Sequence, residues 1–262
     1  MKELTIFAKR RRTYTLVFLG GAALFALAAF ITEYSIIDAF TALPKVASWI
    51  VRNLIPTDRA LAKMPIILAK LAETVLLSLA VTVCAAVCAF AFSLAGTNIT
   101  NTNTWRTRIV RMIASFFRNV PDIVWAMILL FAFGQNILTG FFAMFFTTFG
   151  LLTRMFIEII DETSAASVEA LQAVGATYMH VVFQGIVPSA IAEVASWVLF
   201  MIETNIRNST LIGILTATGV GYLFDLYYKM LDYSAASLVV MTVMVVTVLI
   251  EMISRMFRRV II

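Results

Sequence analysis

The sequence predicts an all-α membrane protein with about six transmembrane helices, and three observations support this fold class. Hydrophobic residues make up 61% of the 262 residues and charged residues only 13%, against about 45–50% and about 25% in soluble domains. The apolar residues gather in runs long enough to cross a bilayer. Basic residues gather between these runs. A soluble enzyme, a disordered chain, a disulfide scaffold and a nucleic-acid module are therefore disfavoured, because a soluble fold of this length cannot bury so much apolar surface.

Six apolar runs approach the roughly 20 residues that a spanning helix needs. They cover residues 14–33, 67–94, 120–134, 137–158, 187–206 and 235–254. The third is short and begins at Pro121, a residue suited to the first turn of a helix. An amphipathic helix is expected before it, over residues 107–118. The stretch 207–233 is apolar but interrupted by glycines, and we interpret it as a re-entrant or interfacial segment.

The basic residues predict the orientation of these spans. With six spans and a cytoplasmic N-terminus, thirteen of the twenty Lys and Arg residues lie inside, including the run Lys9-Arg10-Arg11-Arg12. This excess favours cytoplasmic N- and C-termini. The long loop 34–66 is then extracytoplasmic, and its amphipathic stretch 46–54 is expected to lie along the membrane surface. No soluble domain remains, so the chain is expected to be one transmembrane domain over residues 1–262.

Enzyme signatures are missing from the sequence. There is no phosphate-binding glycine loop and no nucleophile elbow. His180 is the single histidine, so a two-histidine zinc motif is impossible. We therefore expect no catalytic residue, no metal site and no cofactor held by this chain. Asp161 and Glu162 are interpreted as a polar junction at the end of the fourth span.

Ionisable residues inside apolar spans are costly and therefore informative. Glu203 and Arg207 lie four residues apart at the end of the fifth predicted span, in the favourable order for a pair on one helix face. Two interpretations are equally open. The pair stabilises the end of the helix, or Arg207 faces a water-filled path for an anion. In the second case Asn208, Ser209 and Thr210 would supply hydrogen-bond donors.

The inner loop over residues 164–182 predicts a helix, a turn at Gly175 and a second short helix, with Pro188 opening the fifth span. Ser164 or Ser167 is suited to cap the first helix. Gly175 supplies a turn conformation that a β-carbon would obstruct. The alanines of the first helix leave a smooth surface on which another protein can pack.

This loop resembles the EAA motif of inner-membrane permeases of ABC importers. The matching residues are Glu169, Ala170, Gly175 and, thirteen residues later, Pro188, whereas Leu171 stands where the family has a second alanine. In that family the loop is a coupling helix that docks on the ATP-hydrolysing subunit. The resemblance therefore assigns ATPase docking to the following residues: Ser167, Glu169, Ala170, Gly175, Ala176 and Pro188.

Further stretches resemble the phosphonate-type permeases in particular. They are residues 118–126, 168–171 and 203–210 with Gly213, and the match runs in order from about residue 67 to 259. One departure is Thr218, which stands where the family has the first glycine of an Ala-Gly-Gly-Ile-Gly run. The core of the domain is thus expected over 67–259, with the first span and the extracytoplasmic segment over 1–66.

The resemblance implies a type I ABC importer permease fold with a cytoplasmic coupling helix, in a bacterial inner membrane. It also implies a dimer with a second copy or a paralogous permease, two ATP-binding cassette subunits that hold ATP and magnesium, and an extracytoplasmic substrate-binding protein. The substrate would be a phosphonate or related phosphorus oxyanion. Its path would involve Glu203, Arg207, Asn208, Ser209, Thr210, Arg118, Asn119 and Pro121, and its gate or hinge Gly213, Gly219 and Gly221.

Two other functions stay open from the sequence. The first is an ABC permease for another solute, such as phosphate or an amino acid. The second is an ion-coupled secondary transporter, which would need no ATPase and usually carries an inverted internal repeat. No convincing repeat relates the two halves of this sequence.

Overall fold

A computed structural model describes residues 3–99 and 104–261, and every element in that part of the chain is helical. The chain divides into two units, Met1–Asn53 and Leu54–Ile262, which are described separately. Five of the described helices are long and apolar enough to cross a membrane. A sixth span is reached if a bent pair, α5 and α6, counts as one. The predicted fold class, an all-α membrane protein with about six spans, is confirmed.

The first unit holds α1 (Glu3–Ile31) and α2 (Ile36–Asn53). The apolar part of α1, Ala8–Ile31, is the first candidate span. In α2 the polar residues recur every three or four positions, which places them on one face of the helix. They are Asp38, Thr41, Lys45, Ser48 and Arg52. The amphipathic segment predicted at 46–54 is thus the second half of a longer amphipathic helix.

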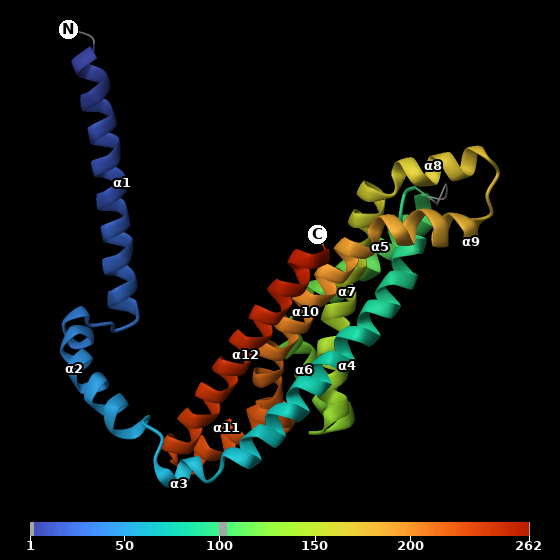
Figure 1. Cartoon of the computed structure of the whole chain (residues 1–262). Helices are drawn as coiled ribbons and strands as arrows, with labels where there is room; N and C mark the ends of the chain where they lie inside the picture. The colour runs from blue at the N-terminus through green and yellow to red at the C-terminus, as the bar shows by residue number, and fades with distance from the viewer. Residues whose placement is uncertain (1–2, 100–103, 262) are drawn as a thin grey trace. The chain divides into compact units, whose positions relative to one another are not determined.

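In the second unit, four long helices pack together: α4 (Met64–Gly96), α7 (Ile137–Thr163), α10 (Val187–Thr216) and α12 (Tyr233–Ile261). Figure 1 shows α8 (Ala165–Ala173) and α9 (Tyr178–His180) at one end of this bundle, and α3 (Asp58–Leu61) and α11 (Gly219–Lys229) at the other. The π-helical turn η1 (Val181–Ile186) joins α9 to α10. The buried core between α4, α7 and α10 includes Phe156, Leu152 and Ile186.

The third predicted span, 120–134, corresponds to α6 (Asp122–Phe133), which is only 12 residues long. At about 1.5 Å per residue it is too short to cross a bilayer alone. The amphipathic α5 (Thr104–Asn119) precedes it, and the two axes differ by 87°. Pro121 is the residue before α6, in extended conformation. Its ring and missing N–H end the helical hydrogen bonding of α5 and permit the bend.

The expected break of the fifth span at residue 206 is wrong, because α10 continues without interruption to Thr216. The polar run that suggested an exit from the membrane, 203–210, lies well inside the helix. Glu203, Asn205 and Asn208 reach partners on neighbouring helices, whereas Ser209 donates to a carbonyl of its own helix. The chain leaves α10 at Ala217, whose φ of 55° is left-handed, and α11 begins two residues later at Gly219.

The start of the fifth span also differs from the expectation. Instead of a short helix followed by a new one at Pro188, helical residues run continuously over Tyr178–Thr216. Pro188 lies at the start of α10, directly after the π-helical turn. Proline donates no N–H and clashes with the carbonyl four residues earlier in an α-helix. A wider turn at this point lets the helix pass through Pro188 instead of ending there.

A buried asparagine joins three helices at the centre of the bundle. The Asn205 side-chain amide donates to the hydroxyls of Thr82 on α4, at 2.9 Å, and Thr148 on α7, at 3.0 Å. The Ser78 hydroxyl donates to the backbone carbonyl of Asn205 at 3.3 Å. All four residues are buried. Because an apolar bundle offers no water, these bonds fix the rotation of α10 against α4 and α7.

Two ion pairs hold the ends of the bundle. The predicted polar junction at Asp161 is present: its carboxylate accepts from the Thr97 hydroxyl, the Asn98 backbone N–H at 3.0 Å and Arg111 at 3.0 Å. At the other end Lys63 pairs with Asp232 at 2.5 Å. The hydrogen bond from Lys63 holds the pKa of the Asp232 carboxyl below its ordinary value.

Glycines permit a close approach of α10 and α11. A β-carbon at Gly221 would lie 2.0 Å from the Thr210 carbonyl oxygen, and one at Gly213 would lie 2.5 Å from the Thr218 carbonyl oxygen. Both are impossible contacts with backbone, which cannot move aside. The α10–α11 packing therefore needs glycine at both positions.

Replacing Gly221 with alanine should destabilise the second unit by about 1–3 kcal/mol or more, the usual effect of overpacking. Gly140→Ala is the matched control, because its new β-carbon would meet only ordinary contacts at 3.5 Å or beyond. We expect a lower melting temperature for the first variant and an unchanged or higher one for the second. Equal melting temperatures for both variants would contradict the close approach.

Candidate substrate path and docking loop

The predicted docking loop, residues 164–182, contains a glycine-terminated helix, α8. After α8, the Ala176 N–H donates to the Leu171 carbonyl and the Gly175 N–H to the Gln172 carbonyl, both at 3.0 Å. Gly175 has φ +78°. This is the Schellman arrangement, which glycine favours because it has no β-carbon penalty in the left-handed region. The predicted turn at Gly175 is confirmed. Ser164 occupies the N-cap position of α8, but its side chain makes no capping bond.

One face of α8 is anchored and the other is free. Val168 is fully buried, and the Ser167 and Ser189 hydroxyls lie 3.4 Å apart, which links α8 to the start of α10. Gly185 lets α8 approach the π-helical turn, since a β-carbon there would meet Leu171 at 3.0 Å. The outward face holds exposed residues, of which the predicted docking set supplies three: Glu169, Ala170 and Gly175. Ala176 is half-buried, and Pro188 is exposed.

Exposed apolar side chains continue this free face. Val174 is 80% exposed, and Tyr178, Met179 and Phe183 are also exposed. A patch of large apolar side chains at a loop is typical of a surface that another protein covers. His180 beside it bonds the Thr177 hydroxyl at 2.6 Å.

The predicted Glu203–Arg207 pair forms, at 2.9 Å. The Glu203 side chain is only 7% exposed, whereas that of Arg207 is 51% exposed. A second arginine, Arg258 of α12, lies 3.5 Å from the other carboxylate oxygen of Glu203. One buried carboxylate thus faces two guanidinium groups, and the group carries a net charge of about +1. The sequence predicted the pairing of Arg207 with Glu203, but it contained no signal that Arg258 also lies next to the Glu203 carboxylate.

Asn208 points to a different neighbour. Its side-chain amide donates to Asp122 at the start of α6, at 2.9 Å. A pocket of about 240 Å³ is lined there by residues of α6 and α10, namely Pro121, Asp122, Ile123, Asn208, Leu211 and Ile212. Pro121 and Asn208 of the predicted path therefore come together. The Asp122 carboxylate on the wall disfavours an anion in this pocket. The pocket therefore differs in its electrostatics from the arginine group, which consists of Glu203 with Arg207 and Arg258.

The other predicted path residues differ in their surroundings. Ser209 is buried and donates to the Ile206 carbonyl at 2.8 Å, whereas the Thr210 hydroxyl is buried without a partner. Arg118 and Asn119 end α5, where the Arg118 backbone packs closely on Gly150 of α7. A role in a substrate path for these residues stays a prediction.

The predicted hinge glycines act as contact points in this conformation. Gly213 and Gly221 allow the approach of α10 and α11, and Gly219 has φ +60° with the Thr74 side chain directly beside it. Thr218, the departure from the family pattern, has an ordinary φ of −128° and its hydroxyl bonds Thr216 at 2.8 Å. A threonine therefore fits there, because the left-handed residue is Gly219.

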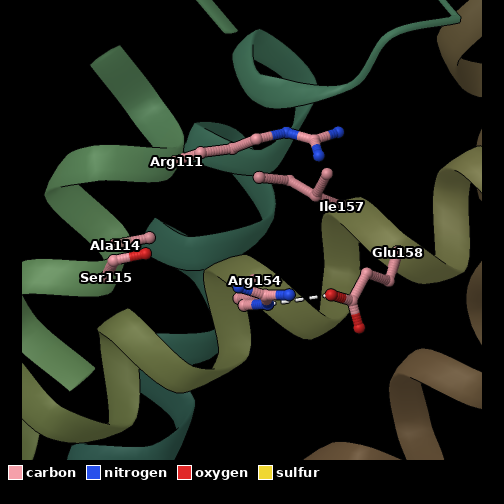
Figure 2. Close-up of a pocket in the computed structure, with 6 residues that line it drawn as sticks. All are labelled: Arg111, Ala114, Ser115, Arg154, Ile157 and Glu158. Carbon is pink, nitrogen blue, oxygen red and sulfur yellow. Dashed lines mark hydrogen bonds and ion pairs between the residues drawn. The ribbon is translucent and has the colours of Figure 1, made fainter. Parts of the chain in front are cut away.

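A second pocket lies between α5 and α7 (Figure 2). It is lined by Arg111, Ala114, Ser115, Arg154, Ile157 and Glu158. Arg154 bonds Glu158 at 2.8 Å, and Arg111 bonds Asp161 at 3.0 Å. Each guanidinium has its own carboxylate, so this pocket carries no surplus positive charge. Among the described residues, no three His, Cys, Asp or Glu side chains lie close enough to bind a metal ion.

Known proteins identify the family. The family described as "Binding-protein-dependent transport system inner membrane component" matches residues 89–261, well over half of the chain. This chain belongs to that family. It is a transport subunit of an ABC importer, not an enzyme. The nucleotide-binding work of such importers is done by a partner ATPase, and binding-protein dependence implies a substrate-binding partner.

Several curated relatives are similar over much of this permease. It is 26% identical to "Putative phosphite transport system permease protein HtxC" of Stutzerimonas stutzeri, over 95% of this chain and 87% of the relative. It is 24% identical to "Phosphate-import permease protein PhnE" of Mycolicibacterium smegmatis, over 72% of this chain but only 35% of that relative.

The solved structures confirm the fold. The MetNI methionine ABC transporter, captured in inward-facing conformations, gives a TM-score of 0.61 at 20% identity, over 74% of this chain and 97% of that one. An amino acid ABC transporter solved with histidines gives a TM-score of 0.60 at 15% identity, over 76% and 95%. The predicted type I importer permease fold is thereby confirmed.

Replacing Gly175 with valine should strain the left-handed turn by about 1–3 kcal/mol and displace the α8 loop. We expect less ATPase subunit to co-purify with the variant. Gly134→Val is the matched control, because Gly134 also has a positive φ, of 73°, with open space around it, but lies outside this loop. Gly175→Asn should keep the partner, since asparagine tolerates this conformation. Full ATPase binding by Gly175→Val would contradict the docking role.

Proposed function

We propose that this permease carries phosphite or a closely related phosphorus oxyanion across the bacterial inner membrane. The observation that carries the proposal is the similarity to HtxC, named "Putative phosphite transport system permease protein HtxC", over 95% of this chain. Other relatives are described as phosphite, phosphate and phosphonate permeases. An exposed guanidinium at Arg207 supports an anionic substrate.

Uptake measurements test the substrate class. The permease would be expressed with its ATPase and binding protein in cells that lack other phosphite uptake, and the entry of labelled phosphite would be followed. Excess phosphonate or phosphate should compete, whereas methionine and histidine should not. Uptake of the amino acids, or uptake that continues without an ATPase, would reject the proposal in favour of the other solute or the secondary transporter.

The free faces of the chain support a proposal for the assembly. Our proposal is a dimer of two copies or of this chain with a paralogous permease, which together enclose the path. The α8 loop of each would dock an ATP-binding cassette subunit, with Ser167, Glu169, Ala170, Gly175, Ala176 and Pro188 at or beneath the contact. ATP and magnesium would stay in those subunits. The binding protein would meet the opposite end, near α3 and α11.

Within the path, Arg207 is proposed to contact the anion, with Glu203 holding its orientation. The pairing geometry supports this role. Glu203 accepts a hydrogen bond from only one N–H group of the half-exposed Arg207, so the other N–H groups remain free to bind an anion. Asn208, Ser209, Thr210, Arg118, Asn119 and Pro121 would form the surrounding walls. Movements of α11 against α10 at Gly213, Gly219 and Gly221 would gate the path.

Replacing Arg207 with glutamine should lower phosphite uptake at least tenfold while assembly with the ATPase persists, because Arg258 still compensates the buried Glu203. The uptake rate per purified complex is the measurement. Arg207→Lys is the control and should keep part of the activity, since the charge stays but the planar fork is lost. Normal uptake by Arg207→Gln would leave the residue a purely structural role. Exchanging the two charges is uninformative, because it would set a second arginine beside Arg258.

The proposed orientation places the α8 end of the bundle, and both chain termini, in the cytoplasm. After replacement of the native Cys84 and Cys88 by serine, single cysteines at Gln172 and Met230 report on the two ends. Both residues are exposed. An impermeant thiol reagent added to intact cells should label the Met230 position and spare the Gln172 position. Labelling of the Gln172 position from outside would reverse the proposed topology.

A further inference from the structure

One face of α10 carries a line of functional groups that extends beyond Arg207. Ser196, Phe200, Glu203 and Arg207 follow one another at intervals of four, three and four residues, so they share a helix face. Along this line, Arg207 lies furthest from the α8 loop and Ser196 nearest to it. Arg258 of α12 meets the same face beside Glu203.

A pocket of about 210 Å³ opens at the Ser196 end of this line. It is lined by Ser196, Trp197, Phe200 and Arg258. The Ser196 hydroxyl is buried and has no hydrogen-bond partner. A serine inside a helix commonly bonds a backbone carbonyl of the preceding turn, and this one does not. A buried hydroxyl without a partner costs free energy and calls for an explanation, such as a ligand that is bound during function.

The charges around the pocket favour an anionic ligand. Glu203 compensates one of its two arginines and leaves the group with about one surplus positive charge. Arg207 holds Glu203 closely, at 2.9 Å, whereas the contacts of Arg258 are long: 3.5 Å to Glu203 and 3.4 Å to the Ser254 carbonyl. A guanidinium has five N–H donors, and most of those of Arg258 are available. Guanidinium and hydroxyl donors together suit tetrahedral phosphorus oxyanions.

We infer that Arg258 and Ser196 form a second oxyanion site, separate from Arg207 and nearer to the α8 loop. Its ligand is a tetrahedral phosphorus oxyanion, either free in the path or as the headgroup phosphate of an anionic phospholipid. Trp197 and Phe200 form its apolar wall. The site stands on the geometry of α10 and α12, whereas the identity of a free ion as phosphite rests on the proposed function.

Trp197 supplies the signal for a test, because its ring lies in the pocket wall, 5.5 Å from that of Phe200. The complete complex without nucleotide is placed in nanodiscs, and tryptophan fluorescence is recorded. In the first arm the nanodiscs contain phosphatidylcholine, and inorganic phosphite is titrated. In the second arm no phosphite is added, and phosphatidylglycerol replaces part of the lipid. Trp197→Phe identifies the part of the signal that comes from the pocket.

We expect a saturable fluorescence change that is absent from Trp197→Phe and is weakened at least tenfold by Arg258→Gln and several-fold by Ser196→Ala. A response in the first arm assigns a free oxyanion, and a response in the second arm alone assigns a lipid headgroup. The double variant Glu203→Gln with Arg258→Gln removes both charges, so it should fold without an unpaired buried carboxylate and still lose the response.

Arg207→Gln separates this site from the proposed path. It should lower uptake at least tenfold but weaken the Trp197 response less than Arg258→Gln does, since Arg207 adds positive charge near the pocket without lining it. No saturable change in either arm, or a full response in the double variant, would overturn the second site. Neither result would bear on the uptake defect of Arg207→Gln, which tests the proposed function by itself.

Discussion

The structure depends on one constraint: polar groups inside an apolar bundle must find their partners within it. The helix α10 carries several of these groups, and three of them reach a different neighbour. Asn205 bonds α4 and α7, Asn208 bonds α6, and Glu203 meets Arg258 of α12. Because each bond fixes the direction of one side chain, together they leave α10 a single rotation in the bundle. Arg207 and Arg258 then lie at the face of α10 that the bonds to α4, α6 and α7 leave free.

Much of this could be predicted from the sequence, where the signal is local. The apolar runs, the Gly175 turn and the Glu203–Arg207 pair all depend on residues a few positions apart. The wrong prediction that the fifth span ends at residue 206 also came from a local signal. A polar run from Glu203 to Thr210 indicates the end of a span when its residues are taken as solvated. In the structure Glu203, Asn205 and Asn208 find partners on other helices, so the helix continues.

The parts that could not be predicted depend on residues far apart in the chain. Arg258 lies 55 positions from Glu203, and Asp122 lies 86 from Asn208. In the sequence Arg258 is one of several basic residues after the last span, where orientation in the membrane already explains it. Only the packing of α12 on α10 brings its charge to the buried carboxylate. Likewise, the sequence cannot predict that the Ser196 hydroxyl lacks a hydrogen-bond partner, because this depends on the residues that pack around it.

The continuity of α10 connects the two proposed functional regions. Helical residues run without a break from Tyr178, beside the proposed docking loop, through Glu203 and Arg207 to Thr216. The α8 helix rests on the first turns of this segment through Val168 and Gly185. A displacement of α8 by a partner ATPase would therefore move one end of a continuous helical segment that also carries Glu203 and Arg207. Since Arg258 belongs to α12, even a small shift of α10 along α12 would change which arginine Glu203 compensates, and the less compensated arginine would hold an anion more strongly.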